Sequence, residues 1–251
     1  MASISVSFDG RATVDVFLAQ LEAAEAAGAA RVWIASHLFE RDPFTLAAMA
    51  LDATQRIDIA LMAVSPYIVH SVQIAMAAAT LCERHPGRLV LCLGTGVPRD
   101  VADAGVLQDR PLATMRDAIA VIGSLLRGEA VGGRRLATGA EAPPIYLAAS
   151  GPRMLALAGA CADGVVVSAG TSDGFVREAL SRVDAGARGR TVHRAGLVYA
   201  AADADRLRGR LAMVLRGAHH RQNVASGGSV DEGLREPCLR HPNNCSNNSA
   251  T

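Results

Sequence analysis

His37 is the ionisable side chain best placed to do chemistry, because it follows the apolar run Arg31 to Ala35 by two residues. Active sites of parallel α/β proteins lie where strands end, and an imidazole can donate or accept a proton near neutral pH. A histidine at such a place can equally be a hydrogen-bonded structural residue. The sequence alone favours neither the catalytic nor the structural interpretation. We take His37 as the candidate catalytic residue and keep the structural alternative open.

A run of small residues that leads straight into a predicted helix is a candidate phosphate site. Ala149, Ser150 and Gly151 precede Pro152, a residue favoured at the first position of a helix, and Arg153 adds a positive charge. The free N–H groups and the positive dipole end at a helix start attract phosphate. The next apolar run ends in a similar loop, so the two loops would form one anion cradle that includes Ser168 and Gly170. An ordinary helix start is the alternative.

Two glycines, Gly94 and Gly96, flank Thr95 at the end of another apolar run. Glycine at the rim of a barrel allows a ligand to approach the backbone closely. The spacing is not a GxGxxG fingerprint, and glycines are common in such turns. This signal therefore counts only together with the other strand ends.

A unit of a short apolar strand followed by a helix recurs about every 30 residues, as a chain of βα units requires. The strands are close to continuous in Val, Ile, Leu and Ala, which is typical of parallel strands buried on both faces. The helices carry apolar residues at helical spacing, such as Val14, Phe17, Leu18 and Leu21. The predicted strands cover residues 4–8, 31–35, 57–64, 89–93, 145–149, 164–168 and 195–200.

These seven units predict an α/β fold, and we favour a TIM-type (β/α) barrel. A doubly wound sheet is the alternative, but the turn after its first strand would carry a glycine fingerprint that Asp9 to Ala12 lack. The candidate ligand groups follow several strands instead, as in a barrel. We expect the barrel to span residues 1–222 and to be truncated, with about seven of eight strands. Residues 223–251 have almost no apolar pattern and are expected to form an irregular, disordered tail.

Composition narrows the class of partner. The chain has 251 residues, 50% of them apolar, and a formal net charge of +1, without a basic stripe. We therefore expect no nucleic acid and no membrane as partner. The five cysteines form no CxxC pair and the amino terminus has no signal-peptide pattern, so a cytoplasmic location is predicted. Cys238, His241 and Cys245 lie in the polar tail, and we expect no metal site there.

At its strand ends the sequence resembles the luciferase-like monooxygenase superfamily, in particular the F420-dependent branch typified by methylenetetrahydromethanopterin reductase. The resemblance covers residues 14–223. It is strongest in three segments: DPFTLAA with ATQRI at residues 42–57, GRL through GTG at residues 87–96, and YLAASGPRMLALAGACADGVVVSAG at residues 146–170.

The resemblance implies a TIM-type barrel that binds coenzyme F420, or alternatively FMN, in its mouth. It implies a non-proline cis peptide between Met62 and Ala63, next to the ring of the cofactor, and places His37 near the reactive part of that ring. Where the family often has aspartate before this histidine, the chain has Ser36. The residues that it assigns to cofactor binding are Ser36, Met62, Ala63, Val64, Gly94, Gly96, Ala149, Ser150, Gly151, Pro152, Ser168 and Gly170.

The implied activity is hydride transfer between the reduced cofactor and a small organic substrate, or oxygen-dependent monooxygenation if the cofactor is FMN. The alternative is a non-catalytic, truncated barrel that binds no cofactor and acts as an oligomeric scaffold. An open barrel leaves the edges of its first and seventh strands unpaired, and a homo-oligomer would cover them.

Overall fold

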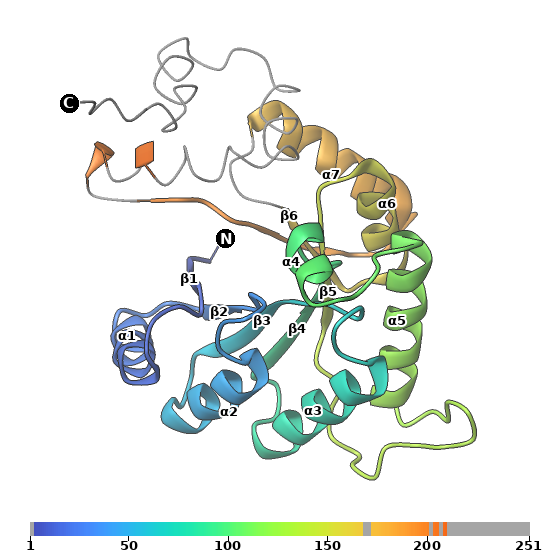
Figure 1. Ribbon diagram of the computed structural model, residues 1–251, viewed down its shortest axis with the longest axis horizontal. Coiled ribbons are helices and arrows are strands. Elements are labelled where there is room, and N and C mark those ends of the chain that lie inside the picture. The colour runs from blue at the N-terminus through green and yellow to red at the C-terminus, as the bar shows by residue number, and fades with distance from the viewer. Residues whose placement is uncertain (1–2, 168–171, 201–202, 206–207, 210–251) are drawn as a thin grey trace, which may run out of the picture.

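The computed structural model describes residues 3–167, 172–200, 203–205 and 208–209. Seven parallel strands lie side by side in the order of the sequence, each hydrogen-bonded to the next (Figure 1). The predicted α/β fold with seven strands is confirmed. The strands are β1 (Ser5–Phe8), β2 (Arg31–Ala35), β3 (Asp58–Val64), β4 (Leu89–Leu93), β5 (Ile145–Ala149), β6 (Gly164–Val167) and β7 (His193–Gly196).

Helices connect the strands, and all of them except the short helix at residues 98–103 cover the outer side of the curved sheet (Figure 1). They are α1 (Val14–Ala26), α2 (Pro43–Ala53), α3 (Ser71–Arg84), α4 (Pro98–Asp103), α5 (Pro111–Leu126), α6 (Pro152–Cys161) and α7 (Asp173–Ala187). Among the helices in the described part of the chain, none has both the length and the apolar character that crossing a membrane requires.

The sheet is strongly curled. Trp33 on β2 and Tyr146 on β5 have ring centroids 6.1 Å apart, although two strands lie between them. Three interstrand steps in a flat sheet would separate such residues by about 14 Å. The ring of His193, on β7, stacks on that of Tyr146 at 6.1 Å. The strands therefore wrap around a shared interior, as in a barrel.

Both faces of the sheet are buried, each in its own apolar cluster. On β2, Val32 and Ile34 point outward into the cluster between the sheet and the helices, while Trp33 points into the inner cluster. This follows from the alternation of side chains along a strand. It explains why the central strands are apolar at nearly every position, as the sequence analysis assumed.

The helix starts follow from local capping. Thr13 accepts a hydrogen bond from the Val16 N–H at 3.4 Å, and Asp42 accepts one from the Thr45 N–H at 2.7 Å. Side-chain oxygens of this kind pair with N–H groups that the first helical turn leaves free. Pro43, Pro111 and Pro152 occupy first helical positions, where the missing N–H costs nothing.

The seventh strand differs from its prediction. The sequence pattern favoured residues 195–200, but β7 is His193–Gly196. Three of its four residues are exposed, so its position is set by hydrogen bonding to β6 and not by apolar side chains. Among the described residues β1 and β7 are the two edge strands. The whole of the predicted tail, residues 223–251, and the predicted boundary at residue 222 lie outside the described residues, so both stay predictions.

Helices α6 and α7 touch through their backbones. A Cβ atom on Gly159 would lie 2.0 Å from the Val183 carbonyl oxygen, and one on Gly186 would lie 2.1 Å from that of Ala156. Neither position has room for a side chain. Arg190 then donates to the carbonyl oxygens of Gly159, at 3.1 Å, and Ala160, at 2.9 Å, near the end of α6. The two helices form one block behind β5 and β6.

Candidate functional site

A cleft of about 220 Å³ lies at the carboxyl ends of β2, β3 and β4. It brings together five of the residues that the sequence predicted for the site: Ser36, His37, Ala63, Val64 and Gly96. Its wall also carries a set of larger apolar side chains and four charged ones, which the sequence analysis did not assign. These are Leu38, Phe39, Phe44, Ile68, Val69 and Val97, and Glu40, Arg41, Asp42 and Asp100.

His37 lies in the wall of this cleft, half-buried, in the loop between β2 and α2. The loop is tied to the preceding strand–helix connection by Arg41, whose Nη1 donates to the carbonyl oxygens of Gly10, at 3.3 Å, and Arg11, at 3.0 Å. Phe39, with φ of 65° and 76% of its surface exposed, stands at the cleft. The structure thus puts an imidazole beside an open apolar surface.

The peptide bond between Met62 and Ala63 is cis, as the resemblance predicted. Ala63 lines the cleft, and the Met62 side chain belongs to the inner apolar cluster. The Met62 carbonyl oxygen accepts a hydrogen bond from the Ser36 N–H at 2.8 Å. Strand β3 and the residue before His37 are therefore joined at the cleft.

The two glycines after β4 have different environments. Gly94 is buried and does not line the cleft, and its N–H donates to the Val64 carbonyl oxygen at 3.0 Å. A Cβ on Gly94 would lie 2.8 Å from the Cβ of Ala63, so this glycine makes room for the protein itself. Gly96 is exposed, lines the cleft and has φ of 79°, which favours glycine.

Sequence reasoning missed the side chains that fix the turn at Thr95 and Gly96. The Ser65 hydroxyl donates to the Thr95 carbonyl oxygen at 3.0 Å. The Gln108 side-chain amide donates to the same oxygen and, at 3.3 Å, to that of Gly96. The position of Ser65 directly after β3 could have identified it. Gln108 lies in the connection between α4 and α5, where no sequence pattern pointed to it.

The predicted phosphate site is at the start of α6. Gly151 is the N-cap residue and is exposed together with Pro152, while Ser150 is half-buried. No described side chain caps this helix, and the first backbone bond back to Gly151 comes from the Leu155 N–H at 2.9 Å. The amides just before Leu155 are therefore free of helical partners. The Ala149 side chain points into the outer apolar cluster, so this residue offers only its backbone.

The cleft and the start of α6 lie at the same edge of the sheet, where the parallel strands have their carboxyl ends, although Ala149, Ser150, Gly151 and Pro152 do not line the cleft. A Cβ on Gly94 would lie 2.8 Å from Ala63, in the cleft, and 3.6 Å from the Cβ of Ala148 on β5. Strand β5 continues directly into Ser150. The remaining predicted residues of the cradle, Ser168 and Gly170, lie outside the described residues and stay predictions.

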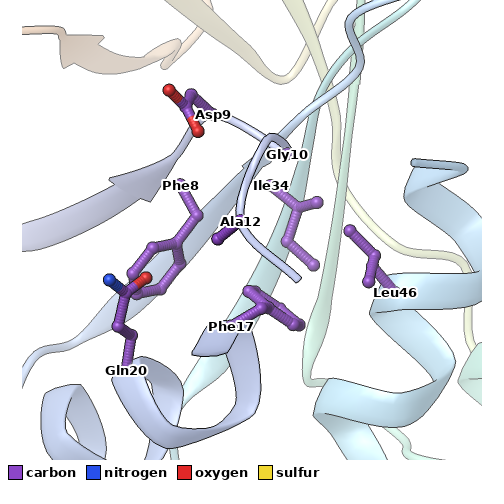
Figure 2. A pocket seen from close by; sticks show the side chains of 8 residues that line it. All are labelled: Phe8, Asp9, Gly10, Ala12, Phe17, Gln20, Ile34 and Leu46. Carbon is purple, nitrogen blue, oxygen red and sulfur yellow. The ribbon is translucent and has the colours of Figure 1, made fainter. Parts of the chain in front are cut away.

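A second cavity, of about 20 Å³, lies between β1, α1, β2 and α2 (Figure 2). Figure 2 shows the side chains of Phe8, Phe17, Ile34 and Leu46 around it, with Gln20 on one side. The rings of Phe8 and Phe17 pack edge to face at 5.4 Å. This space holds about one water molecule and belongs to the packing of the outer layer. Within the described part of the chain, no group of three or more His, Cys, Asp or Glu is arranged to hold a metal ion.

The chain is similar to known proteins. The family model for the luciferase-like monooxygenase matches residues 4–243. The 5,10-methylenetetrahydromethanopterin reductase of Methanolobus tindarius is 34% identical over 175 residues, which are 66% of this chain and 53% of that protein. An F420-dependent glucose-6-phosphate dehydrogenase of Nakamurella multipartita is 33% identical over 141 residues, 51% of this chain and 42% of that protein.

The fold is also similar to solved structures. An F420-dependent secondary alcohol dehydrogenase, solved with an F420-acetone adduct, superposes with a TM-score of 0.74 at 20% identity, over 86% of this chain and 74% of the other. The chain spans about half the length of the curated relatives that it matches. The family match extends over nearly the whole sequence and agrees with the curled sheet of parallel strands. The chain belongs to the luciferase-like monooxygenase family.

Proposed function

We propose that the chain is an oxidoreductase that uses coenzyme F420 to transfer hydride to or from a small organic substrate. FMN, with oxygen-dependent monooxygenation, is the alternative cofactor. Relatives at 33–34% identity support the proposal, since one is named an F420-dependent dehydrogenase and the other a reductase.

The single observation that carries the proposal is that the cleft and the free amides of α6 lie at the same edge of the sheet. A deazaflavin or flavin has a flat, largely apolar ring and an anionic tail. The cleft offers backbone at Ala63 and Gly96 and an apolar wall for the ring. The start of α6 offers N–H groups and a positive dipole end for the tail. The residues present therefore fit the group.

We assign roles to the predicted residues accordingly. Ser36, Met62, Ala63 and Val64 would hold one side of the ring, with Gly96 at its edge and Gly94 packed behind Ala63. Ala149, Ser150, Gly151 and Pro152 would bind the phosphate of the tail, together with Ser168 and Gly170. When bound, the cofactor supplies hydride chemistry at its ring. His37 would hold or move the proton of a substrate oxygen or nitrogen in the cleft.

Cofactor titration tests the proposal. The purified chain is titrated with F420 and, separately, with FMN, and binding is followed by quenching or shift of the cofactor's own fluorescence. We expect saturable binding, tighter for F420. Absence of binding for both, at high micromolar concentration and with a folded chain, would overturn the proposal and favour the non-catalytic scaffold.

We further propose that the substrate is a small molecule, that the protein acts in the cytoplasm, and that a second copy covers the edges of β1 and β7. The free thiols of Cys82, Cys92 and Cys161 fit a reducing compartment. Exposed strand edges favour pairing with another chain. Gel filtration combined with light scattering reports the oligomeric state, and a strictly monomeric chain would contradict the last point.

A further inference from the structure

Gln108 reaches from the connection between α4 and α5 to the turn that follows β4. Its side-chain amide donates to the carbonyl oxygens of both Thr95 and Gly96. The Ser65 hydroxyl, 7% exposed, donates to the Thr95 oxygen as well. Two side chains from different segments thus hold two consecutive carbonyl groups of this turn.

Holding the carbonyl groups also sets the direction of the next amides. In a trans peptide unit the C=O and N–H groups point to opposite sides. Because the Thr95 and Gly96 oxygens point toward Gln108, the N–H groups of Gly96 and Val97 point away from it. Within the described residues neither N–H has a backbone acceptor, and both residues line the cleft. Two adjacent donors on residues that line the cleft therefore have no hydrogen-bond acceptor among the described residues.

We propose that Gln108 is a positioning residue for the cleft, acting through the turn at Thr95 and Gly96. It keeps the Gly96 and Val97 amides available for a hydrogen-bond acceptor, a carbonyl oxygen or ring nitrogen on the flat ring of the cofactor. This inference rests on the proposed function. It goes beyond it by giving a binding role to a residue outside the cleft wall.

The segment that carries Gln108 is also attached by a second contact. This contact allows the effect of holding the turn to be separated from the effect of holding the segment. The Tyr67 hydroxyl donates to the carbonyl oxygen of Asp109, the residue next to Gln108. Tyr67 does not line the cleft and does not touch the turn in the described contacts. Losing the Tyr67 hydroxyl removes a bond to the segment alone, whereas losing the Gln108 amide removes a bond to each of the two carbonyl groups of the turn.

Three variants test the inference: Gln108→Leu, Gln108→Glu and Tyr67→Phe. At pH about 7.5 we expect both Gln108 variants to bind F420 roughly three- to tenfold more weakly than the wild type, since one or two hydrogen bonds are lost. Tyr67→Phe is expected to bind like the wild type. Thermal melting of each chain without cofactor shows whether folding is retained.

The pH dependence of Gln108→Glu gives the sharper measurement. A carboxylate has no proton to donate to the Thr95 oxygen, but a protonated carboxyl does. Relative to the wild type at each pH, the affinity of Gln108→Glu should recover as pH falls from about 7.5 toward about 5. Gln108→Leu has no group that titrates, so its affinity relative to the wild type should show no such recovery.

The outcomes separate the two proposals. If the wild type binds F420 and the Gln108 variants bind equally well, or if Tyr67→Phe weakens binding as much as they do, the role of Gln108 is overturned and the proposed function stands. If Gln108→Leu does not fold, the pH response of Gln108→Glu decides alone. A folded wild type that binds neither F420 nor FMN overturns the proposed function and the role of Gln108 with it.

Discussion

Gly94 and Ala63 approach so closely that a Cβ atom on the glycine would lie 2.8 Å from the Cβ of the alanine. The contact joins the ends of β4 and β3 where the Met62–Ala63 peptide is cis. Real Cβ atoms do not come this near to each other, so a side chain at position 94 must displace the residue that lines the cleft.

Replacing Gly94 by alanine is therefore expected to reshape the cleft. We expect Gly94→Ala to lower the free energy of unfolding by about 1–3 kcal/mol, as overpacking in a core does, and to weaken F420 binding. Gly139→Ala is the matched control, because Gly139 is exposed and a Cβ there meets nothing within 4 Å. Urea unfolding and cofactor titration of both variants measure the effects. Equal stabilities for the two variants would contradict the prediction.

A negative charge at the start of α6 should act in opposite directions on stability and on binding. We expect Ser150→Asp to keep or raise stability, by about 0.3–1 kcal/mol, because an anion there interacts favourably with the helix dipole. The same charge repels the anionic tail of the cofactor, so affinity should fall at least roughly tenfold. Ser150→Asn has nearly the same shape without the charge and should retain most of the affinity. If Ser150→Asp binds F420 as tightly as the wild type, the anionic tail of the cofactor binds somewhere other than the start of α6.

His37 and His70 provide a comparison of two histidines near the same rim. His37 lines the cleft, whereas His70 caps α3 by accepting the Val72 N–H on its Nδ1 at 3.2 Å. We expect His37→Ala to reduce turnover about a hundredfold or more, with little change in stability. His70→Ala should cost about 1 kcal/mol of stability and leave turnover close to that of the wild type. The experiment measures cofactor oxidation or reduction with a substrate found by screening. Equal turnover for both variants would remove the proton role of His37.

Glu25 should stabilise the fold in a pH-dependent way. Its carboxylate accepts the Arg56 N–H at 2.8 Å, the Gln55 N–H at 3.0 Å and the Ile57 N–H at 3.1 Å. The bond from Arg56, above all, together with those from Ile57 and Gln55, holds the pKa of this carboxyl below its ordinary value of 4.5, against a smaller effect of burial. A folded-state pKa below that of the unfolded chain gives stability that is present above the unfolded value and is lost as pH falls through the folded value.

Glu25→Gln should accordingly be less stable than the wild type by about 1 kcal/mol at pH 7, with the difference shrinking once pH falls below about 4.5. Glu22→Gln, at an exposed position of the same helix, serves as the control and should follow the wild type. Urea unfolding across the pH range gives both curves. A difference that stays constant down to the lowest pH would show that the charge of Glu25 is not the cause.

The strands and long helices were predictable because burial determines their residue types: strands buried on both faces are apolar throughout, and helices buried on one face repeat apolar residues at helical spacing. Central strands such as β4 have apolar residues at every position, and α5 repeats its apolar residues at helical spacing. The short helix α4 was missed, since its six residues are too few to show a period. Strand β7 was misplaced because an exposed edge strand is specified by backbone pairing, which leaves little trace in side-chain type.

Within the candidate site, the positions at strand ends were predictable, but the contacts between loops were not. His37, Ala63 and Gly96 follow or end apolar runs, and they share one cleft. Gln108 meets Thr95 across 13 residues of sequence, through a loop of no regular pattern. The different surroundings of Gly94 and Gly96 depend equally on which neighbouring strand each one faces, and this appears only once the sheet has curled.

The paired glycines of α6 and α7 bear on how the anion loop would meet its ligand. With Gly159 against Val183 and Gly186 against Ala156, the two helices pack backbone to backbone. If the start of α6 binds the anionic tail as proposed, we expect this packing to preorganise its N–H groups, because conformational entropy given up on folding is not lost again on binding. A helix pair with larger side chains at this crossing would pack less closely, and the start of α6 would then lose more conformational entropy when it binds an anion.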